Sequence, residues 1–177
     1  MSLHEANLAN LLNAYGMYKG RYERKKFCKE ILKLKENEII SFREVPTSLI
    51  FKRKQALDVQ LQVLKSLKNY FLTSIEKERI VKALPETINP CNMFCDFVIF
   101  HKKNGEIHKT IIELNGVQHY ENENSSQFAE QLSRDMAKYI LSKNEDIEIL
   151  SYKLTSDCEF SPVRNEITNI LMQKRGA

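Results

Sequence analysis

The chain has 177 residues, which is enough for one domain with a sizeable hydrophobic core. A hydrophobic content of 42%, a charged content of 28% and a net charge of +4 exclude a fibrous or a disordered protein. The sequence has no apolar run near the roughly 20 residues of a membrane span, and its first residues lack the pattern of a secretory signal. We therefore expect no membrane partner and a cytoplasmic protein, or a nuclear one if its host has a nucleus.

Residues 1–54 are predicted to form a basic, mainly helical extension. Apolar side chains recur at helical spacing over residues 5–35, and Gly16 and Gly20 are expected to divide this stretch into two helices. Residues 39–51 mix β-branched and aromatic residues around a proline and carry no clear assignment. The extension is expected to precede a separate core that begins at residue 55.

The basic charge of the chain is concentrated in this N-terminal part. Residues 1–56 hold 12 lysines and arginines against 6 acidic residues, whereas the rest of the chain holds 15 against 17. Tyrosines lie between the basic residues, as in many nucleic-acid-binding segments. Lys25, Lys26 and Lys29 are the candidate phosphate contacts, and the alternative is an ordinary solvated helix face.

Residues 55–177 are predicted to form an α/β core. Leucines at three- and four-residue steps predict an amphipathic helix over residues 55–72, and residues 75–83 are expected to form a strand. The four cysteines of the chain are interpreted as small buried hydrophobic residues. Cys91 and Cys95 are spaced like half of a zinc site, but the sequence offers no second pair to complete one.

Two β-type runs in the core predict a hairpin. Residues 94–100 and residues 108–115 are rich in branched and aromatic side chains, and the turn dipeptide Asn104-Gly105 lies between them. The two runs are therefore expected to pair as antiparallel strands.

The last part of the core is predicted to be helix, strand and helix. Ser125 can cap a helix that ends near Asn144. Residues 147–152 alternate loosely as a strand, and Pro162 is a favourable first residue for the final helix. From residue 55 onward the predicted order of elements is helix, three strands, helix, strand and helix.

Each run of the hairpin carries one carboxylate, Asp96 or Glu113, within an otherwise apolar segment. Two carboxylates close together are unfavourable unless a cation neutralises them. Oxygen ligands of this kind favour Mg²⁺ or Mn²⁺ over zinc, and the Leu114 carbonyl could supply a third ligand. The alternatives are local: Asp96 could cap a turn, and Glu113 could pair with a neighbouring basic residue.

Three residues beyond the hairpin complete the predicted catalytic site. His119 lies six residues after Glu113 and could serve as the general base for the attacking water. Asp135 could orient His119, and Lys138 could contact a phosphate. Asp135 and Lys138 also have the spacing of a common surface ion pair on a helix, which is the alternative interpretation.

These residues resemble the motifs of the PD-(D/E)xK nuclease superfamily, in the branch related to very-short-patch-repair and homing endonucleases. The resemblance rests on Asp96-Phe97, on the ten residues from Ile111 to Tyr120, and on Arg134-Asp135-x-x-Lys138. It covers about residues 55–160. It implies a restriction-endonuclease-like core, in which a four-stranded mixed sheet is flanked by helices.

The resemblance also implies a function. Asp96 and Glu113 would be metal ligands, His119 the general base and Asp135 its partner. Asn115 occupies the position of the usual catalytic lysine of the motif, so water activation would depend on His119. The family's helical glutamate also has no clear counterpart, since only Asp58 or Gln60 lies near its position.

The leading hypothesis is accordingly an Mg²⁺- or Mn²⁺-dependent endonuclease that hydrolyses phosphodiester bonds in DNA, of restriction, homing, repair or mobile-element type. The alternatives are an RNA-directed relative, an inactive nuclease fold that binds nucleic acid or a protein, and a structural subunit. A homodimer and a nicking monomer are both compatible with the sequence.

Overall fold

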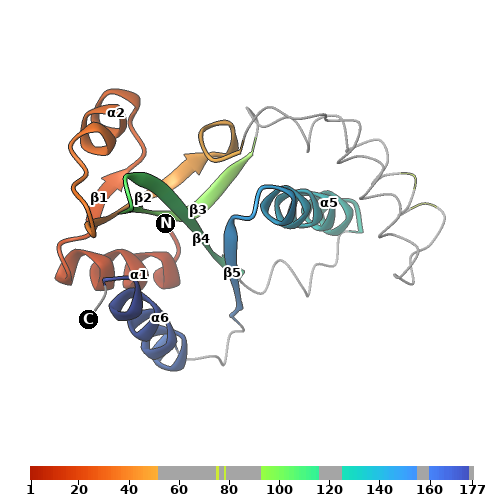
Figure 1. Ribbon diagram of the computed structural model, residues 1–177. Coiled ribbons are helices and arrows are strands. Elements are labelled where there is room, and N and C mark those ends of the chain that lie inside the picture. Colours follow the sequence, from red (N-terminus) through yellow and green to blue (C-terminus); the bar gives the residue numbers. More distant parts are fainter. Residues whose placement is uncertain (52–74, 76–77, 79–92, 116–124, 155–159, 176–177) are drawn as a thin grey trace. The chain divides into compact units, whose positions relative to one another are not determined.

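The computed structural model describes residues 1–51, 75, 78, 93–115, 125–154 and 160–175. Over these residues the protein is α/β, with a five-stranded sheet of order β1-β2-β3-β4-β5 flanked by helices (Figure 1). Strands β1 and β2 are parallel and strands β3 and β4 are antiparallel, so the sheet is mixed. The predicted α/β class is confirmed, and the sheet has one strand more than the predicted four.

The strands are β1 (Tyr18–Arg21), β2 (Ile39–Pro46), β3 (Phe94–Lys103), β4 (Glu106–Asn115) and β5 (Glu148–Lys153). The helices are α1 (Leu3–Ala14), α2 (Arg24–Leu32), the short 3₁₀ helix η1 (Thr47–Leu49), α5 (Ser125–Asn144) and α6 (Phe160–Lys174). The Ser2 hydroxyl accepts from the Glu5 N–H, and the Glu5 carboxylate accepts from the Ser2 N–H, so a complete capping box begins α1.

The chain forms two compact units. The first comprises Met1–Val45, Cys95–Leu114 and Glu148–Ala177, and the second comprises Pro46–Phe94 and Asn115–Ile147. The first unit holds α1, α2 and α6 together with most of the sheet, whereas the second holds η1 and α5. Residues from both sides of the predicted division at 54/55 therefore belong to the first unit.

One face of the sheet is covered by α1 and α6. These two helices lie next to each other on the same side of the strands (Figure 1). Their buried side chains share one apolar cluster with alternate residues of the strands. The cluster consists of Leu8, Ala9, Leu12, Met17, Ile39, Phe97, Ile99, Ile112, Leu114, Leu154, Ile167 and Leu171. Burial of these side chains is the main stabilising contribution on this face.

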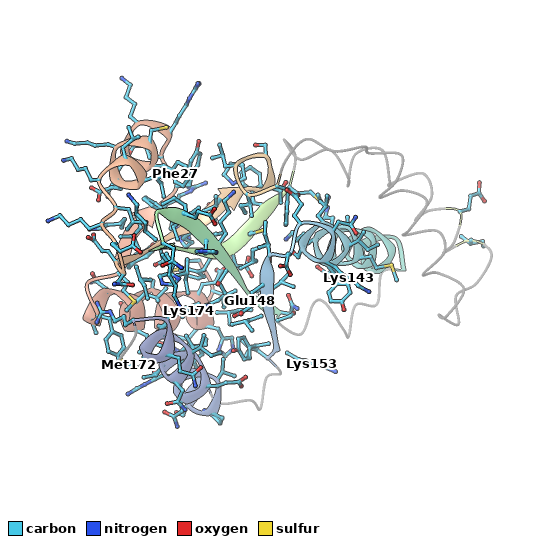
Figure 2. All side chains as sticks on the ribbon, viewed as in Figure 1. Phe27, Lys143, Glu148, Lys153, Met172 and Lys174 are labelled. Carbon is cyan, nitrogen blue, oxygen red and sulfur yellow. The ribbon has the colours of Figure 1, made fainter. Side chains whose placement is uncertain are left out.

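The opposite face of the sheet carries α2. Phe27, the buried residue of this short helix, packs edge-to-face on Phe42 of β2 and Phe100 of β3, with both pairs of ring centroids 5.2 Å apart (Figure 2). Phe100 alternates with the cluster residues Phe97 and Ile99 along β3, so it points away from α1 and α6. Helices on both faces explain why residues 97–100 are buried without interruption.

The predicted hairpin of β3 and β4 is confirmed. Its register pairs Lys103 with Glu106 across the two-residue loop Asn104-Gly105. Both loop residues have positive φ, 54° for Asn104 and 77° for Gly105, as a type I′ turn requires. The Glu36 carboxylate accepts hydrogen bonds from the N–H groups of Asn104 and Gly105, which joins the chain before β2 to the tip of the hairpin.

Replacing Gly105 by alanine is expected to lower the free energy of unfolding by about 1–2 kcal/mol, because an L-residue disfavours this left-handed conformation. A Cβ at this position would meet no atom within 4 Å, so the cost comes from the backbone and not from a clash. Urea unfolding measures it, with Asn104→Gly as the control that keeps a residue tolerant of positive φ. Equal stability of Gly105→Ala and the wild type would contradict the assigned turn.

The N-terminal segment differs from its prediction. The sequence predicts a mainly helical extension over residues 1–54, whereas the structure also forms β1 and β2 there, and both belong to the sheet. The predicted helical stretch is divided into two helices near Gly16 and Gly20, but the residues between α1 and α2 form strand β1. Gly16, just after the end of α1, has φ 68°, and Gly20, within β1, has φ 106°; glycine adopts both conformations readily.

The C-terminal elements agree with the sequence. Helix α5 spans Ser125–Asn144, β5 begins at Glu148, and α6 contains Pro162 in its first turn, as predicted within two residues. The predicted helix over 55–72 lies outside the described residues. Within the segment 75–83, predicted as a strand, the structure describes Ile75 and Glu78, and both are helical, so the strand assignment is wrong at these positions.

The cysteines confirm one part of their interpretation. Cys95 is buried, whereas Cys28 is exposed on α2, which corrects the prediction that both are buried. Cys91 and Cys158 lie outside the described residues.

Candidate functional site

The predicted metal ligands Asp96 and Glu113 lie near the start of β3 and the end of β4. The hairpin register pairs Phe97 with Ile112, so its continuation by one residue sets Asp96 opposite Glu113. Directly opposite residues of an antiparallel pair share a face, with their Cβ atoms about 4.5–5.5 Å apart. Glu113 is 7% exposed and Asp96 is half-buried. Strand alternation thus places both carboxylates on one face of the hairpin.

A hydrogen bond holds Asp96 in this position. The backbone N–H of Leu114 donates to Asp96 Oδ2 at 3.1 Å. Since Leu114 follows Glu113 directly, the Asp96 carboxylate lies against the stretch of β4 that carries the second acid. The bond also gives Asp96 a structural part in joining the two strands. This resembles the local capping role that is the alternative interpretation of its sequence position.

Apolar side chains border the two carboxylates. Val98, Phe100 and Ile111 continue the same face of the hairpin and are buried. Carboxylates next to apolar side chains lose hydration, and two of them repel each other. A divalent cation between Asp96 and Glu113 would relieve both costs.

The donor set fits a hard cation that keeps some of its water. Among the described residues, no group of three His, Cys, Asp or Glu side chains could hold a metal ion. Mg²⁺ is commonly bound by one or two carboxylates, with water and substrate phosphate as its other ligands. Asp96, Glu113 and the backbone carbonyl of Leu114 match that pattern, whereas a structural zinc site would need four protein ligands.

The other predicted catalytic residues are described in part. Asn115 is the last residue of β4 and is 8% exposed. In the second unit, Asp135 and Lys138 lie on α5, where Asp135 is half-buried and Lys138 is 8% exposed. His119 lies outside the described residues. The catalytic roles of Asn115, His119 and Asp135, and the phosphate contact of Lys138, stay predictions.

The predicted phosphate contacts Lys25, Lys26 and Lys29 are all exposed on α2. Arg24 and Lys33 extend the same basic surface, which we call the α2 basic row (Arg24, Lys25, Lys26, Lys29 and Lys33). Within the described part of the chain, no member of the row forms an ion pair, whereas Lys19 on β1 pairs with Glu30 at 3.6 Å.

The α2 basic row is unfavourable for the helix itself. Lys25, Lys29 and Lys33 follow each other at four-residue steps, and like charges at that spacing destabilise a helix by about 0.2–0.5 kcal/mol for each pair. The N-cap residue Glu23 supplies one negative charge at the N-terminal end, but the first turn itself contains no acidic residue. An anionic partner would offset both effects.

Sequence reasoning missed two features of this surface. It placed Arg24 and Lys33 in the basic segment but not among the phosphate contacts, although the four-residue spacing from Lys25 to Lys33 was a usable signal. It also could not show that α2 packs on the sheet face that carries the carboxylates, because that depends on Phe27 contacting Phe42 and Phe100.

A second pair of titratable residues lies at the other end of the hairpin. His101 and His108 are opposite each other, with ring centroids 6.0 Å apart. Burial lowers the pKa of His101 below its ordinary value of 6.5, and the nearby cations Lys174, His108 and Lys103 lower it further. Glu36 acts in the opposite direction. Lys174 of α6 also pairs with Glu148 of β5 at 3.7 Å (Figure 2).

The lowered pKa of His101 predicts a pH-dependent stability. Below about pH 6.5 the unfolded chain takes up a proton at this residue more readily than the folded chain. The contribution of neutral His101 to the free energy of unfolding is therefore complete above the pKa of the unfolded chain, and it is lost as the pH falls through the lower pKa of the folded chain. Urea unfolding of wild type and His101→Gln across about pH 5–8 measures it. The free energy of unfolding of His101→Gln should depend less on pH than that of the wild type. Identical pH dependence of the two would contradict a lowered pKa of His101.

Comparison of the chain with protein-family models, curated proteins and solved structures gives no match. No family is assigned. The functional argument therefore rests on the residues themselves. In the described part of the chain, no helix is both long and apolar enough to cross a membrane.

Proposed function

We propose that the protein is a metal-dependent endonuclease that hydrolyses phosphodiester bonds in DNA, with a core of the PD-(D/E)xK type. The observation that carries the proposal is that Asp96 and Glu113 lie on one face of the hairpin, where the Leu114 N–H donates to Asp96. The exposed α2 basic row supports a polyanionic substrate. The mixed sheet with helices around it is compatible with that core.

Asp96, Glu113 and the Leu114 carbonyl would hold Mg²⁺ or Mn²⁺. When bound, the ion would polarise the phosphate, make its bound water more acidic and stabilise the charge on the leaving oxygen. The buried position of Glu113 keeps its carboxylate orientation fixed, because packing of β4 against its neighbours limits its movement. His119 would accept the proton of the attacking water, since Asn115 has no basic group to do so.

The alternative of an inactive, nucleic-acid-binding fold shares the α2 basic row and predicts binding without cleavage. Both functions predict nucleic-acid binding that weakens as the salt concentration rises, because lysine contacts to phosphates release counterions. They differ only in whether the bound nucleic acid is cleaved. An RNA-directed relative differs from both in its substrate.

Incubation of the purified protein with supercoiled plasmid DNA and, in parallel, with structured RNA separates these functions. With Mg²⁺ or Mn²⁺ we expect nicked or linear DNA, and EDTA should stop the reaction. Cleavage restricted to RNA would support the RNA-directed relative. Salt-sensitive binding with no cleavage of either substrate would refute the enzyme and leave a binding module.

A further inference from the structure

The α2 basic row and the carboxylate pair occupy the same face of the sheet in the first unit. Phe27 fixes α2 over Phe100 of β3, on the face opposite to α1 and α6 (Figures 1 and 2). Asp96 is four residues before Phe100 on the same strand, so it points to the same face. Both features therefore lie on the same side of the sheet, and Lys25 and Lys29 lie on the outer side of α2, about 160° round the helix from Phe27.

The offset along β3 between Asp96 and the position under α2 follows from strand geometry. At about 3.3 Å for each residue, four residues of β3 separate Asp96 from the position under α2 by about 13 Å. The row itself extends about 12 Å along the helix from Lys25 to Lys33, at about 1.5 Å for each residue. One strand of duplex DNA carries a phosphate for about every 3.4 Å of its axis. The offset therefore corresponds to about four nucleotides.

The direction of the row is set by the chain on either side of α2. The Tyr22 N–H before the helix donates to the Arg43 carbonyl at 2.7 Å, near the end of β2. After the helix, Glu36 binds the turn at Asn104 and Gly105, at the tip of the hairpin. The row thus runs toward the hairpin tip, whereas Asp96 lies near the opposite end of β3.

We propose that α2 holds the cleaved DNA strand on one side only of the scissile phosphate, with its contacts centred about four nucleotides away. This inference rests on the proposed nuclease function and adds the position of the bound strand. Its consequence is an asymmetric substrate requirement: the enzyme needs several nucleotides on one flank of the cut and fewer on the other. Lys25, Lys29 and Lys33 are the contacts on the longer flank.

The test maps cut positions in a pool of short randomised duplexes by sequencing the product ends. For wild type with Mg²⁺, cuts should be depleted by several-fold within about four nucleotides of one end of the cleaved strand, either 5′ or 3′, and should approach the other end more closely. The double variant Lys25→Gln/Lys29→Gln should lose this asymmetry. The matched variant Lys143→Gln/Lys153→Gln removes two exposed lysines elsewhere and should retain it (Figure 2).

The possible failures are distinguishable. Cuts that approach both ends equally in the wild type would overturn the one-sided contact but leave the nuclease in place. Asymmetry that survives in Lys25→Gln/Lys29→Gln would assign the longer flank to another surface and also overturn the inference. If the wild type makes no cuts at all, the proposed function fails and this inference fails with it.

Discussion

Replacing Asp96 by asparagine is expected to abolish metal-dependent DNA cleavage while leaving the fold intact. Asparagine keeps an oxygen that can accept the hydrogen bond from the Leu114 N–H, but it removes the negative charge that a divalent cation needs. A loss of about 3 kcal/mol of transition-state stabilisation would slow the reaction by about 10²-fold. Plasmid cleavage under single-turnover conditions gives the rate, and urea unfolding gives the stability.

Glu113→Gln should behave in the same way, because it also removes the charge with little change in shape. Loss of the charge from either member of the pair also removes the repulsion between them, so neither variant should be much less stable than wild type. Full cleavage activity in both Asp96→Asn and Glu113→Gln would rule out this site. A large loss of stability in both would instead make the two acids structural.

Asp96→Ala separates the structural contribution from the chemical one. It removes both the charge and the acceptor, leaving the Leu114 N–H without the partner that the structure shows. An unsatisfied buried donor costs about 1–3 kcal/mol. We therefore expect Asp96→Ala to be inactive and also less stable than Asp96→Asn.

The second large effect is expected on DNA binding by the α2 basic row. Each phosphate contact contributes about 0.9 to the slope of log K against log salt concentration on duplex DNA. Lys25→Gln/Lys29→Gln should therefore reduce that slope by about 1.8 and weaken binding similarly on all sequences. Fluorescence anisotropy at several salt concentrations measures both quantities, in EDTA so that no cleavage occurs.

Two comparisons make this result specific to α2. Lys143→Gln/Lys153→Gln changes the net charge by the same amount, and its salt slope should stay close to that of the wild type. Phe27 is left in place in both variants, so α2 keeps its packing on Phe42 and Phe100. Equal salt slopes for the two double variants would mean that the row is an ordinary solvated surface.

Local signals in the sequence were sufficient for the hairpin and for α5. Asn104-Gly105 is among the strongest short turn signals, and the structure uses both residues with positive φ. The hairpin register then follows from a two-residue loop, and strand alternation places Asp96 and Glu113 on one face of the hairpin. The four-residue apolar spacing after Ser125 was long enough to predict α5 with its correct bounds.

The first two strands were missed for physical reasons. Strand β1 has four residues, of which Lys19 and Arg21 are charged and Gly20 has φ 106°, so no alternation marks it. In β2 the residues 39–42 are buried without interruption, because helices cover both faces of the sheet, and Glu44 adopts φ 55°. Their place in the sheet depends on pairing between distant segments, which local patterns do not contain.

The central claim is that Asp96 and Glu113 bind one divalent cation. A crystal of the protein soaked in Mn²⁺ and measured for anomalous scattering tests it most directly. The account predicts an anomalous peak between the two carboxylates, within about 2.0–2.6 Å of an oxygen from each, and its loss in Glu113→Gln. Mn²⁺ bound at another position, or no peak beside these residues at saturating Mn²⁺, would contradict it.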